Sequence, residues 1–336
     1  MNYNVITCIQ PTKPMKAITY NKYGGTSQLK LTEVERPTPN DDEVLIKTKA
    51  AGVNDWDWGL VHGKPLLIRM MFGLFKPKKA KILGCDVAGI VEEVGINIKN
   101  LKVGDRVFGD LSGGNFGGFA EFTRAKEKEL AIIPENMSFE EAAALPHAGV
   151  LAYQAFFDYL QLQPGHTVLI NGAGGGVGTI GIPILKHLGV KVTGVDSSQK
   201  LDLMKSLGAD EVLDYKQQDF SRLGKKWDLV IDNKVFRKAS AYKRSLKKDG
   251  VLVMVGGSTL KVFLFAAFGS IISPNKKLKL LMHKPNKGID KLIEFYNQGI
   301  FKPFVGNTFP LEKTPEAIEQ LGKGKTMGKT VVVING

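Results

Sequence analysis

The sequence predicts an α/β fold in which a doubly wound parallel sheet is joined to a mostly β domain. Residues 167–200 read as a strand, a glycine turn, a helix and a second strand. Strand and helix patterns then alternate through residues 201–255, and repeated β-α-β units with short connections build a parallel sheet. The first 135 residues instead alternate between strand patterns and turns, with few long helical patterns, which favours a mostly β domain.

Residues 167–200 have the pattern of a dinucleotide-binding site. Thr167–Asn171 is a short apolar, β-branched run typical of a buried parallel strand, and residues 177–188 have apolar side chains at helical spacing. The glycines between them would let a pyrophosphate approach backbone N–H groups at the start of a helix. Asp196 ends the next strand, 18 residues after Gly178, where a carboxylate can bind a ribose diol. The register that ends in Gly178 begins with Ala173 rather than glycine, so a generic glycine-rich turn is the alternative.

Ligands of such sheets bind at the carboxyl ends of the strands. We therefore expect the cofactor to lie against the glycine turn and the residues that end the neighbouring strands. These predicted contact residues are Ala173, Gly174, Gly175, Gly176, Val177, Asp196, Tyr215, Asn233, Gly256 and Gly257.

Length and composition limit the classes of protein that the sequence can encode. With 336 residues, 43% hydrophobic and 24% charged, the chain is expected to form a globular protein of two domains. Its net charge of +13 is spread along the chain without a nucleic-acid-binding motif, so we expect a basic surface that attracts anionic cofactors and no nucleic-acid partner. Cys8 and Cys85 are too few for a disulfide framework, which suits a reducing, cytoplasmic location.

No targeting or membrane-spanning segment is expected. Residues 1–14 lack the basic and apolar regions of a secretory signal and precede a natural first strand at Met15, so either Met1 or Met15 could be the functional start. The most apolar run, residues 262–272, is too short to cross a bilayer.

Residues 54–81 are the least regular part of the predicted β domain. Residues 54–58 follow a strand directly, where active-site groups often lie. Residues 62–81 are apolar and basic together, with glycine and proline breaks, and three interpretations remain open: a lid over a substrate pocket, a membrane-surface patch, or a packed excursion. Further on, Ser138 and Glu141 predict a capping box before a helix, at the passage into the parallel-sheet domain.

Several segments resemble the medium-chain dehydrogenase/reductase superfamily, namely AAGVNDWDWGLVHG, GCDVAGIVEEVG, LKVGDRVFG, GGFAEF and NGAGGGVGTIGIPILKHLG. The segments SLGADEVLDY, KKWDLVIDNK, KPN and GKTVVVI resemble its zinc-free quinone oxidoreductase branch, which includes zeta-crystallin. The resemblance implies a GroES-like catalytic domain made of residues 1–135 and a C-terminal return over residues 281–336. A Rossmann NAD(P)-binding domain would occupy residues 136–280.

The resemblance allows the zinc question to be examined residue by residue. Zinc alcohol dehydrogenases of the superfamily carry a cysteine at the position of Asn54, a His-Glu pair at Cys85 and Asp86, and another cysteine near His147. Catalytic zinc needs three well-placed ligands, and Asn54 is a poor one. We therefore expect no metal, with His147 as a packed residue at the start of a helix.

These features predict a zinc-independent oxidoreductase that transfers hydride from NAD(P)H to a small-molecule quinone or α,β-unsaturated carbonyl. Without a metal, the developing oxyanion needs hydrogen bonds, and Asn54 is the candidate to orient nicotinamide or substrate. Asp57 is the second catalytic candidate, although an ionised carboxylate donates no proton and we expect it chiefly to hold its loop. A zinc-type alcohol dehydrogenase and a dinucleotide-binding protein without turnover remain alternatives. The resemblance also implies a homodimer.

The residue Asp196 and the family resemblance favour different dinucleotides. The zinc-free branch mostly uses NADPH, and Ser197, Lys200 and Tyr215 stand where the family binds the 2′-phosphate. Asp196 instead suits the ribose diol of NADH and repels a phosphate. We therefore expect both cofactors to be used, with NADH accepted at least as well as NADPH.

Overall fold

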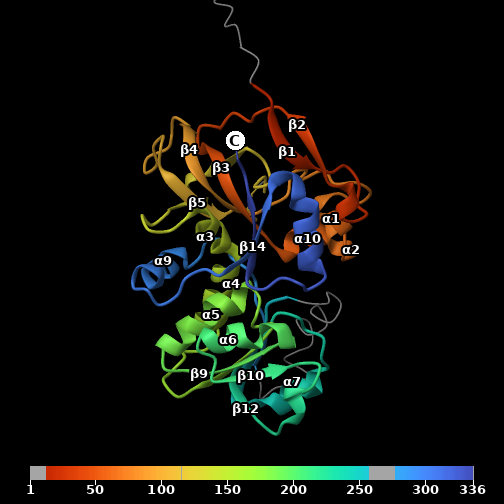
Figure 1. The fold of residues 1–336 in the computed structure, drawn as a ribbon, viewed down its shortest axis with the longest axis vertical. Helices are drawn as coiled ribbons and strands as arrows, with labels where there is room; N and C mark the ends of the chain where they lie inside the picture. The colour runs from red at the N-terminus through yellow and green to blue at the C-terminus, as the bar shows by residue number, and fades with distance from the viewer. Residues whose placement is uncertain (1–12, 115, 257–276, 336) are drawn as a thin grey trace, which may run out of the picture.

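Two β-sheets organise the part of the chain that the computed structural model describes, residues 13–114, 116–256 and 277–335. In Figure 1, one sheet lies in the upper, orange to yellow half of the molecule, and the other lies in the lower, green to cyan half. The blue C-terminal segment runs back to the upper half. Gly257 and the apolar run at residues 262–272 lie outside the described residues.

The lower sheet contains six parallel strands in the order β10-β9-β8-β11-β12-β13. They are β8 (Thr167–Asn171), β9 (Lys191–Asp196), β10 (Glu211–Asp214), β11 (Trp227–Asp232), β12 (Leu246–Met254) and β13 (Lys277–Leu280). The chain enters in the middle at β8, proceeds to one edge, and then crosses to the other side of β8 at β11. This order is that of the doubly wound dinucleotide-binding sheet, which confirms the predicted fold class.

Helices cover both faces of this sheet. They include α4 (Pro146–Phe157), α5 (Gly176–His187), α6 (Leu201–Ser206) and α7 (Ala239–Ser245). Val168 and Ile170 of β8 pack with side chains of α4, α5 and α6, whereas Leu169 packs with Tyr242 of α7 on the opposite face. This alternation places β8 at the centre of the core. The turn that follows it lies at the carboxyl ends of the parallel strands.

Helix α7 begins only at Ala239, although β11 ends at Asp232. Asp232 accepts hydrogen bonds through Oδ1 from the backbone N–H groups of Lys234 and Val235. Val235 has a φ of 45°, which no helix tolerates. The side chain that ends β11 therefore delays the start of the helix.

The upper sheet has seven strands and takes them from both ends of the chain. They are β3 (Glu43–Val53), β4 (Asp86–Val94), β5 (Arg106–Asp110), β6 (Phe122–Lys126), β7 (Ala131–Ile132), β14 (Val305–Pro310) and β15 (Lys329–Val333). Strand β15 pairs antiparallel with β3, so that Thr330 lies opposite Val53. This pairing brings the C-terminal segment beside the end of β3, where α1 begins.

The remaining elements surround this sheet. A separate ribbon consists of β1 (Met15–Thr19) and β2 (Lys30–Val34), and the other helices are α1 (Asp55–His62), α2 (Leu66–Phe72), α3 (Phe139–Ala144), α9 (Ile289–Asn297) and α10 (Thr314–Gly322). Short 3₁₀ turns lie at Thr26–Gln28, Glu127–Glu129 and Leu311–Lys313, and two further ones, Ser198–Lys200 and Phe220–Arg222, lie in connections of the lower sheet. The predicted capping box at Ser138 begins α3. The domain boundaries at residues 135/136 and 280/281 stay a prediction.

Candidate active site

In the glycine turn between β8 and α5, only Gly175 has open space where a Cβ would lie. A Cβ at Gly178 would lie 2.1 Å from the carbonyl oxygen of Ala173, so the helix packs on the strand too closely for any side chain. A Cβ at Gly175 would meet only the carbonyl oxygen of Gly172, at 3.4 Å. Gly175 caps α5, whose first N–H groups have no partner within the helix. The turn therefore fits the pyrophosphate of a dinucleotide.

The carboxylate of Asp196 is tied into this turn. Its Oδ2 accepts a hydrogen bond of 2.9 Å from the N–H of Gly174, and its Oδ1 accepts one of 2.8 Å from the N–H of Ser197. The ammonium group of Lys200 lies 3.3 Å from Oδ1. The Lys200 side chain covers Gly174, since a Cβ there would lie 2.6 Å from its Cδ. Asp196 thus stabilises the turn through its hydrogen bond to Gly174, and Lys200 balances its charge.

The other predicted contact residues lie at the same edge of the sheet. Tyr215 is half exposed, and its N–H donates to the carbonyl oxygen of Asp196. Asn233 donates from Nδ2 to the carbonyl oxygen of Asn171, while its buried Oδ1 has no hydrogen-bond partner among the described residues. A Cβ at Gly256 would lie 3.0 Å from the carbonyl oxygen of Asn233. The unpaired Oδ1 of Asn233 suits a hydroxyl donor of a ligand.

The C-terminal segment connects this turn to the upper sheet. The N–H of Gly328 donates to the carbonyl oxygen of Gly174 at 2.8 Å, and Gly328 forms a parallel bridge with Gly175. The side chain of Lys329 passes over Gly176, where a Cβ would lie 2.7 Å from the lysine Cδ. The two sheets therefore meet at the glycine turn.

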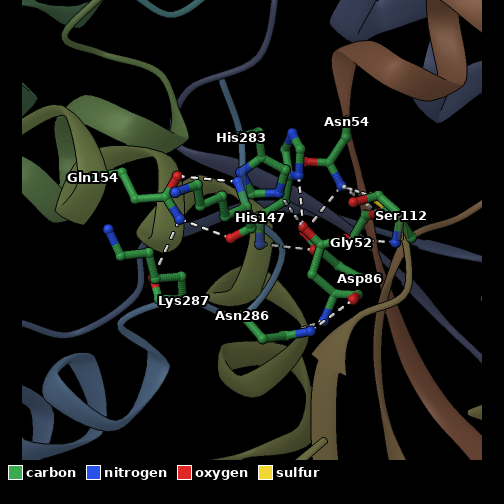
Figure 2. A network of polar contacts seen from close by, with 12 residues as sticks. Gly52, Asn54, Asp86, Ser112, His147, Gln154, His283, Asn286 and Lys287 are labelled. Atoms are coloured by element: carbon green, nitrogen blue, oxygen red, sulfur yellow. Dashed lines mark hydrogen bonds and ion pairs between the residues drawn. The ribbon is translucent and has the colours of Figure 1, made fainter. Parts of the chain in front are cut away.

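Lys329 holds together the polar residues at this junction. Its Nζ donates to Oδ1 of Asn54 at 2.6 Å and to Oδ2 of Asp86 at 3.0 Å, and all three side chains are buried. Asn54 donates from Nδ2 to the same Asp86 oxygen at 2.9 Å and to the sulfur of Cys85 at 3.3 Å. Figure 2 shows Asn54 and Asp86 side by side in this network. Lys329 could not be identified as a site residue from the sequence, because the segment GKTVVVI indicates only the family and residue spacing gives Lys329 no partner.

Both carboxylate oxygens of Asp57 accept hydrogen bonds from backbone N–H groups, one at the start of its own helix and one on a distant segment. Oδ2 accepts from the N–H of Asn54 at 2.8 Å, and Oδ1 accepts from the N–H of Gly84 at 2.9 Å. Burial raises the pKa of Asp57 to about 7, although both backbone donors favour the ionised form. The arrangement makes Asp57 the residue that positions Asn54, and a catalytic role for Asp57 itself stays a prediction.

Another buried carboxylate, that of Asp110, joins two histidines that lie far apart in the sequence. His147 Nδ1 and His283 Nε2 are each 2.8 Å from Asp110 Oδ2, and their rings lie 4.5 Å apart (Figure 2). Burial alone would raise the pKa of Asp110, but the two histidines hold it well below its usual value. Burial alone would lower the pKa of His147, but Asp110 raises it overall. His147 is thus favoured in its charged form, a role that the sequence analysis did not foresee.

The donor set at this junction does not fit a catalytic zinc ion. Among the described residues, Cys85, Asp110 and His147 place potential ligand atoms within 4.8 Å of one another. However, the carboxylate of Asp110 already accepts hydrogen bonds from two histidines. The ammonium group of Lys329 also occupies the place beside Asn54 and Asp86. This fixed cation opposes metal binding at those two residues.

Comparison with known proteins identifies two family models in the chain. Residues 40–135 match the alcohol dehydrogenase GroES-like domain, and residues 207–332 match the zinc-binding dehydrogenase model. A chloroplastic quinone oxidoreductase from Triphysaria versicolor is 35% identical over 95% of this chain and 98% of its own. A 2-methylene-furan-3-one reductase from Solanum lycopersicum is 34% identical over 97% of this chain and 81% of its own.

A solved structure has the same fold over nearly the whole chain. The Escherichia coli quinone oxidoreductase complexed with NADPH superposes with a TM-score of 0.81 at 26% identity, covering 95% of this chain and 99% of the other.

Within the described residues, no helix has the length and apolar content needed to cross a bilayer.

Proposed function

Since the chain belongs to the medium-chain dehydrogenase/reductase superfamily, among its quinone oxidoreductases, we propose that it is a zinc-independent NAD(P)H-dependent oxidoreductase. Its hydride acceptor would be a quinone or an α,β-unsaturated carbonyl, the chemistry that the names of its relatives share. The observation that carries the proposal is the contact of an open glycine turn with the buried pair Lys329 and Asn54. This contact supports a cofactor site that would lie beside a fixed cation.

The residues of the lower sheet would hold a nicotinamide dinucleotide, which supplies the hydride when bound. The turn at Gly175 and the first N–H groups of α5 fit its pyrophosphate. Asn233 Oδ1 would accept a hydrogen bond from a ribose hydroxyl. Asn54 would orient the nicotinamide or the substrate.

Lys329 is the residue that would stabilise the charge developing on the substrate. Hydride addition to a conjugated carbonyl leaves negative charge on its oxygen, and a preorganised cation or hydrogen-bond donor stabilises that charge. Lys329 supplies a buried cation whose three N–H groups donate to the Val53 carbonyl oxygen, Asn54 and Asp86, so it would act through its charge and through the Asn54 side chain that it holds in place. We assign no step to zinc, because the donor set does not fit one.

Both dinucleotides are proposed as cofactors, with NADH accepted at least as well as NADPH. Asp196 would meet the adenosine ribose and disfavour a 2′-phosphate. Lys200 lies close enough to Asp196 to offset part of this repulsion, and it could bind the phosphate if it left the carboxylate. Ser197 and Tyr215 are the further candidates for phosphate contact.

A steady-state assay of the purified chain tests the proposal. NADH and NADPH oxidation is measured with a quinone, an enone and a simple aldehyde, before and after dialysis against a chelator, together with the zinc content. We expect turnover with the quinone or the enone, unchanged by the chelator, and zinc well below one equivalent. Activity that disappears with the chelator and returns with zinc would indicate a zinc alcohol dehydrogenase. Cofactor binding without oxidation by any acceptor would indicate a binding protein.

A homodimer and a cytoplasmic location complete the proposal. Size-exclusion chromatography with light scattering tests the first, and fractionation of the source cells tests the second.

A further inference from the structure

Helix α2 presents apolar side chains both to the core and to solvent. Ile68 is buried, and Phe72 packs edge-on against Phe116 of the upper domain. The side chains on the other face are exposed, with Met70 at 68% and Phe75, just beyond the helix, at 88%. The exposed apolar residues of this face are Leu66, Leu67, Met70, Met71, Leu74 and Phe75. We call these six residues the outer face.

The outer face belongs to an ordered segment. The hydroxyl group of Tyr23 donates to the carbonyl oxygen of Gly73 at 2.8 Å, and Arg69 Nε donates to the carbonyl oxygen of Gly63 at 3.1 Å. The N–H of Lys78 donates a hydrogen bond of 2.8 Å to the carbonyl oxygen of Phe72. The apolar side chains are therefore held outward by the fold and are not the product of a frayed end.

Cations alone surround the outer face in the sequence. Residues 58–84 contain no aspartate or glutamate, but they contain Lys64, Arg69, Lys76, Lys78, Lys79 and Lys81. All five lysines are exposed, and none forms an ion pair within the described part of the chain. Such a cluster of exposed cations attracts anionic partners.

We propose that the outer face docks on an anionic lipid bilayer. Its apolar side chains would enter the boundary between headgroups and acyl chains, while the lysines contact anionic headgroups in the same plane. Nucleic acid would satisfy the cations but leave six large apolar side chains in water, because its contacts are mainly to phosphate. A second copy of the chain would satisfy the apolar side chains, but a two-fold interface would bring the two lysine clusters together.

Vesicle binding by the full-length chain tests this proposal without any turnover, so its failure is distinguishable from failure of the proposed function. Co-sedimentation is measured with vesicles of phosphatidylcholine alone and of phosphatidylcholine mixed with phosphatidylglycerol. Wild type is expected to bind the mixed vesicles at least tenfold more tightly, with binding that weakens as salt rises.

Two variants separate the two parts of the surface. Leu74→Ser with Phe75→Ser removes apolar side chains, and Lys76→Gln with Lys78→Gln and Lys79→Gln removes three charges. Each is expected to lower binding to mixed vesicles by about tenfold or more. The matched control replaces Lys102, Lys128 and Lys226 by glutamine, since these lysines are exposed elsewhere. It is expected to retain most of the binding.

Other outcomes would overturn the proposal. Equal binding to both vesicle types, or equal loss in the control, would show that the outer face has no specific role. Loss in the charge variant alone would assign the surface to a purely ionic partner such as nucleic acid. A wild-type dimer that the serine variant converts to a monomer, without vesicle binding, would assign the outer face to a second copy of the chain.

Discussion

Lys329 donates a hydrogen bond of 2.6 Å to Asn54, which lies 275 positions earlier in the chain. Antiparallel pairing of β15 with β3 brings the two residues together, and the bond from Gly328 to Gly174 fixes the same segment against the glycine turn. One short C-terminal segment thus touches both the predicted cofactor site and the predicted catalytic residue. Removing the Lys329 charge should therefore affect stability and activity together.

Lys329→Met is expected to destabilise the protein by roughly 3–5 kcal/mol, because it leaves the buried Asp86 carboxylate without its cation. Chemical denaturation measures the loss. Lys313→Met is the matched control, since Lys313 is exposed and 3.9 Å from Glu316, and its effect should stay within about 1 kcal/mol. In the double variant Lys329→Met with Asp86→Leu, the loss should be smaller than the sum of the two single losses. Additive losses would contradict the pairing.

Gly175→Val should weaken cofactor binding without unfolding the protein. Gly175 has an extended backbone, with φ −93° and ψ −177°, that a β-branched residue adopts, and the space above it is open. A valine would fill the space where a pyrophosphate approaches, so the dissociation constant for NADPH should rise at least about tenfold. Gly178→Ala provides the contrast, because its Cβ clashes with Ala173 and should lower stability instead. Unchanged NADPH titration in folded Gly175→Val would refute the assigned pyrophosphate site.

Asp196→Ser should shift preference toward NADPH by about tenfold or more, since about 1.4 kcal/mol of relieved repulsion is sufficient. Lys200→Ala should act in the opposite direction, because it removes the cation available to a 2′-phosphate. The quantity to compare is the ratio of kcat/KM for the two cofactors. Loss of the hydrogen bond to Gly174 affects both cofactors alike and cancels in this ratio. A ratio that stays constant in Asp196→Ser would show that the carboxylate does not face the adenosine ribose.

His147 should make stability fall as the pH rises above neutrality. Asp110 raises the pKa of His147 in the folded protein, so the folded state holds a proton that the unfolded chain releases earlier. The stabilising contribution is complete below the unfolded pKa, about 6.5, and is lost as the pH rises through the folded value. In His147→Gln this decline should be smaller, whereas His187→Gln, a change at an exposed helix position, should keep it. Equal pH profiles for the wild type and His147→Gln would contradict the pairing with Asp110.

The elements on either side of the glycine turn could be predicted from the local sequence pattern. The order strand, turn, helix, strand and acid predicted β8, α5 and β9, and the bounds differ by only a residue at most ends. These elements are set by neighbours in sequence, through apolar spacing and glycine positions. The carboxylate of Asp196 was less predictable, because its bonds to Gly174 and Lys200 depend on how the turn folds back on it.

The sequence by itself determined the fold class, the family resemblance and the place of the glycine turn, because each depends on spacing within a short window. The tertiary structure alone decided which polar groups meet. Lys329 reaches Asn54, and Asp110 joins His147 to His283, only because strands and loops remote in sequence pack at one junction. A side chain's partner across such a distance leaves no periodic signal in a single sequence. The burial that shifts the pKa values of Asp57 and Cys85 likewise arises only when the two sheets have assembled.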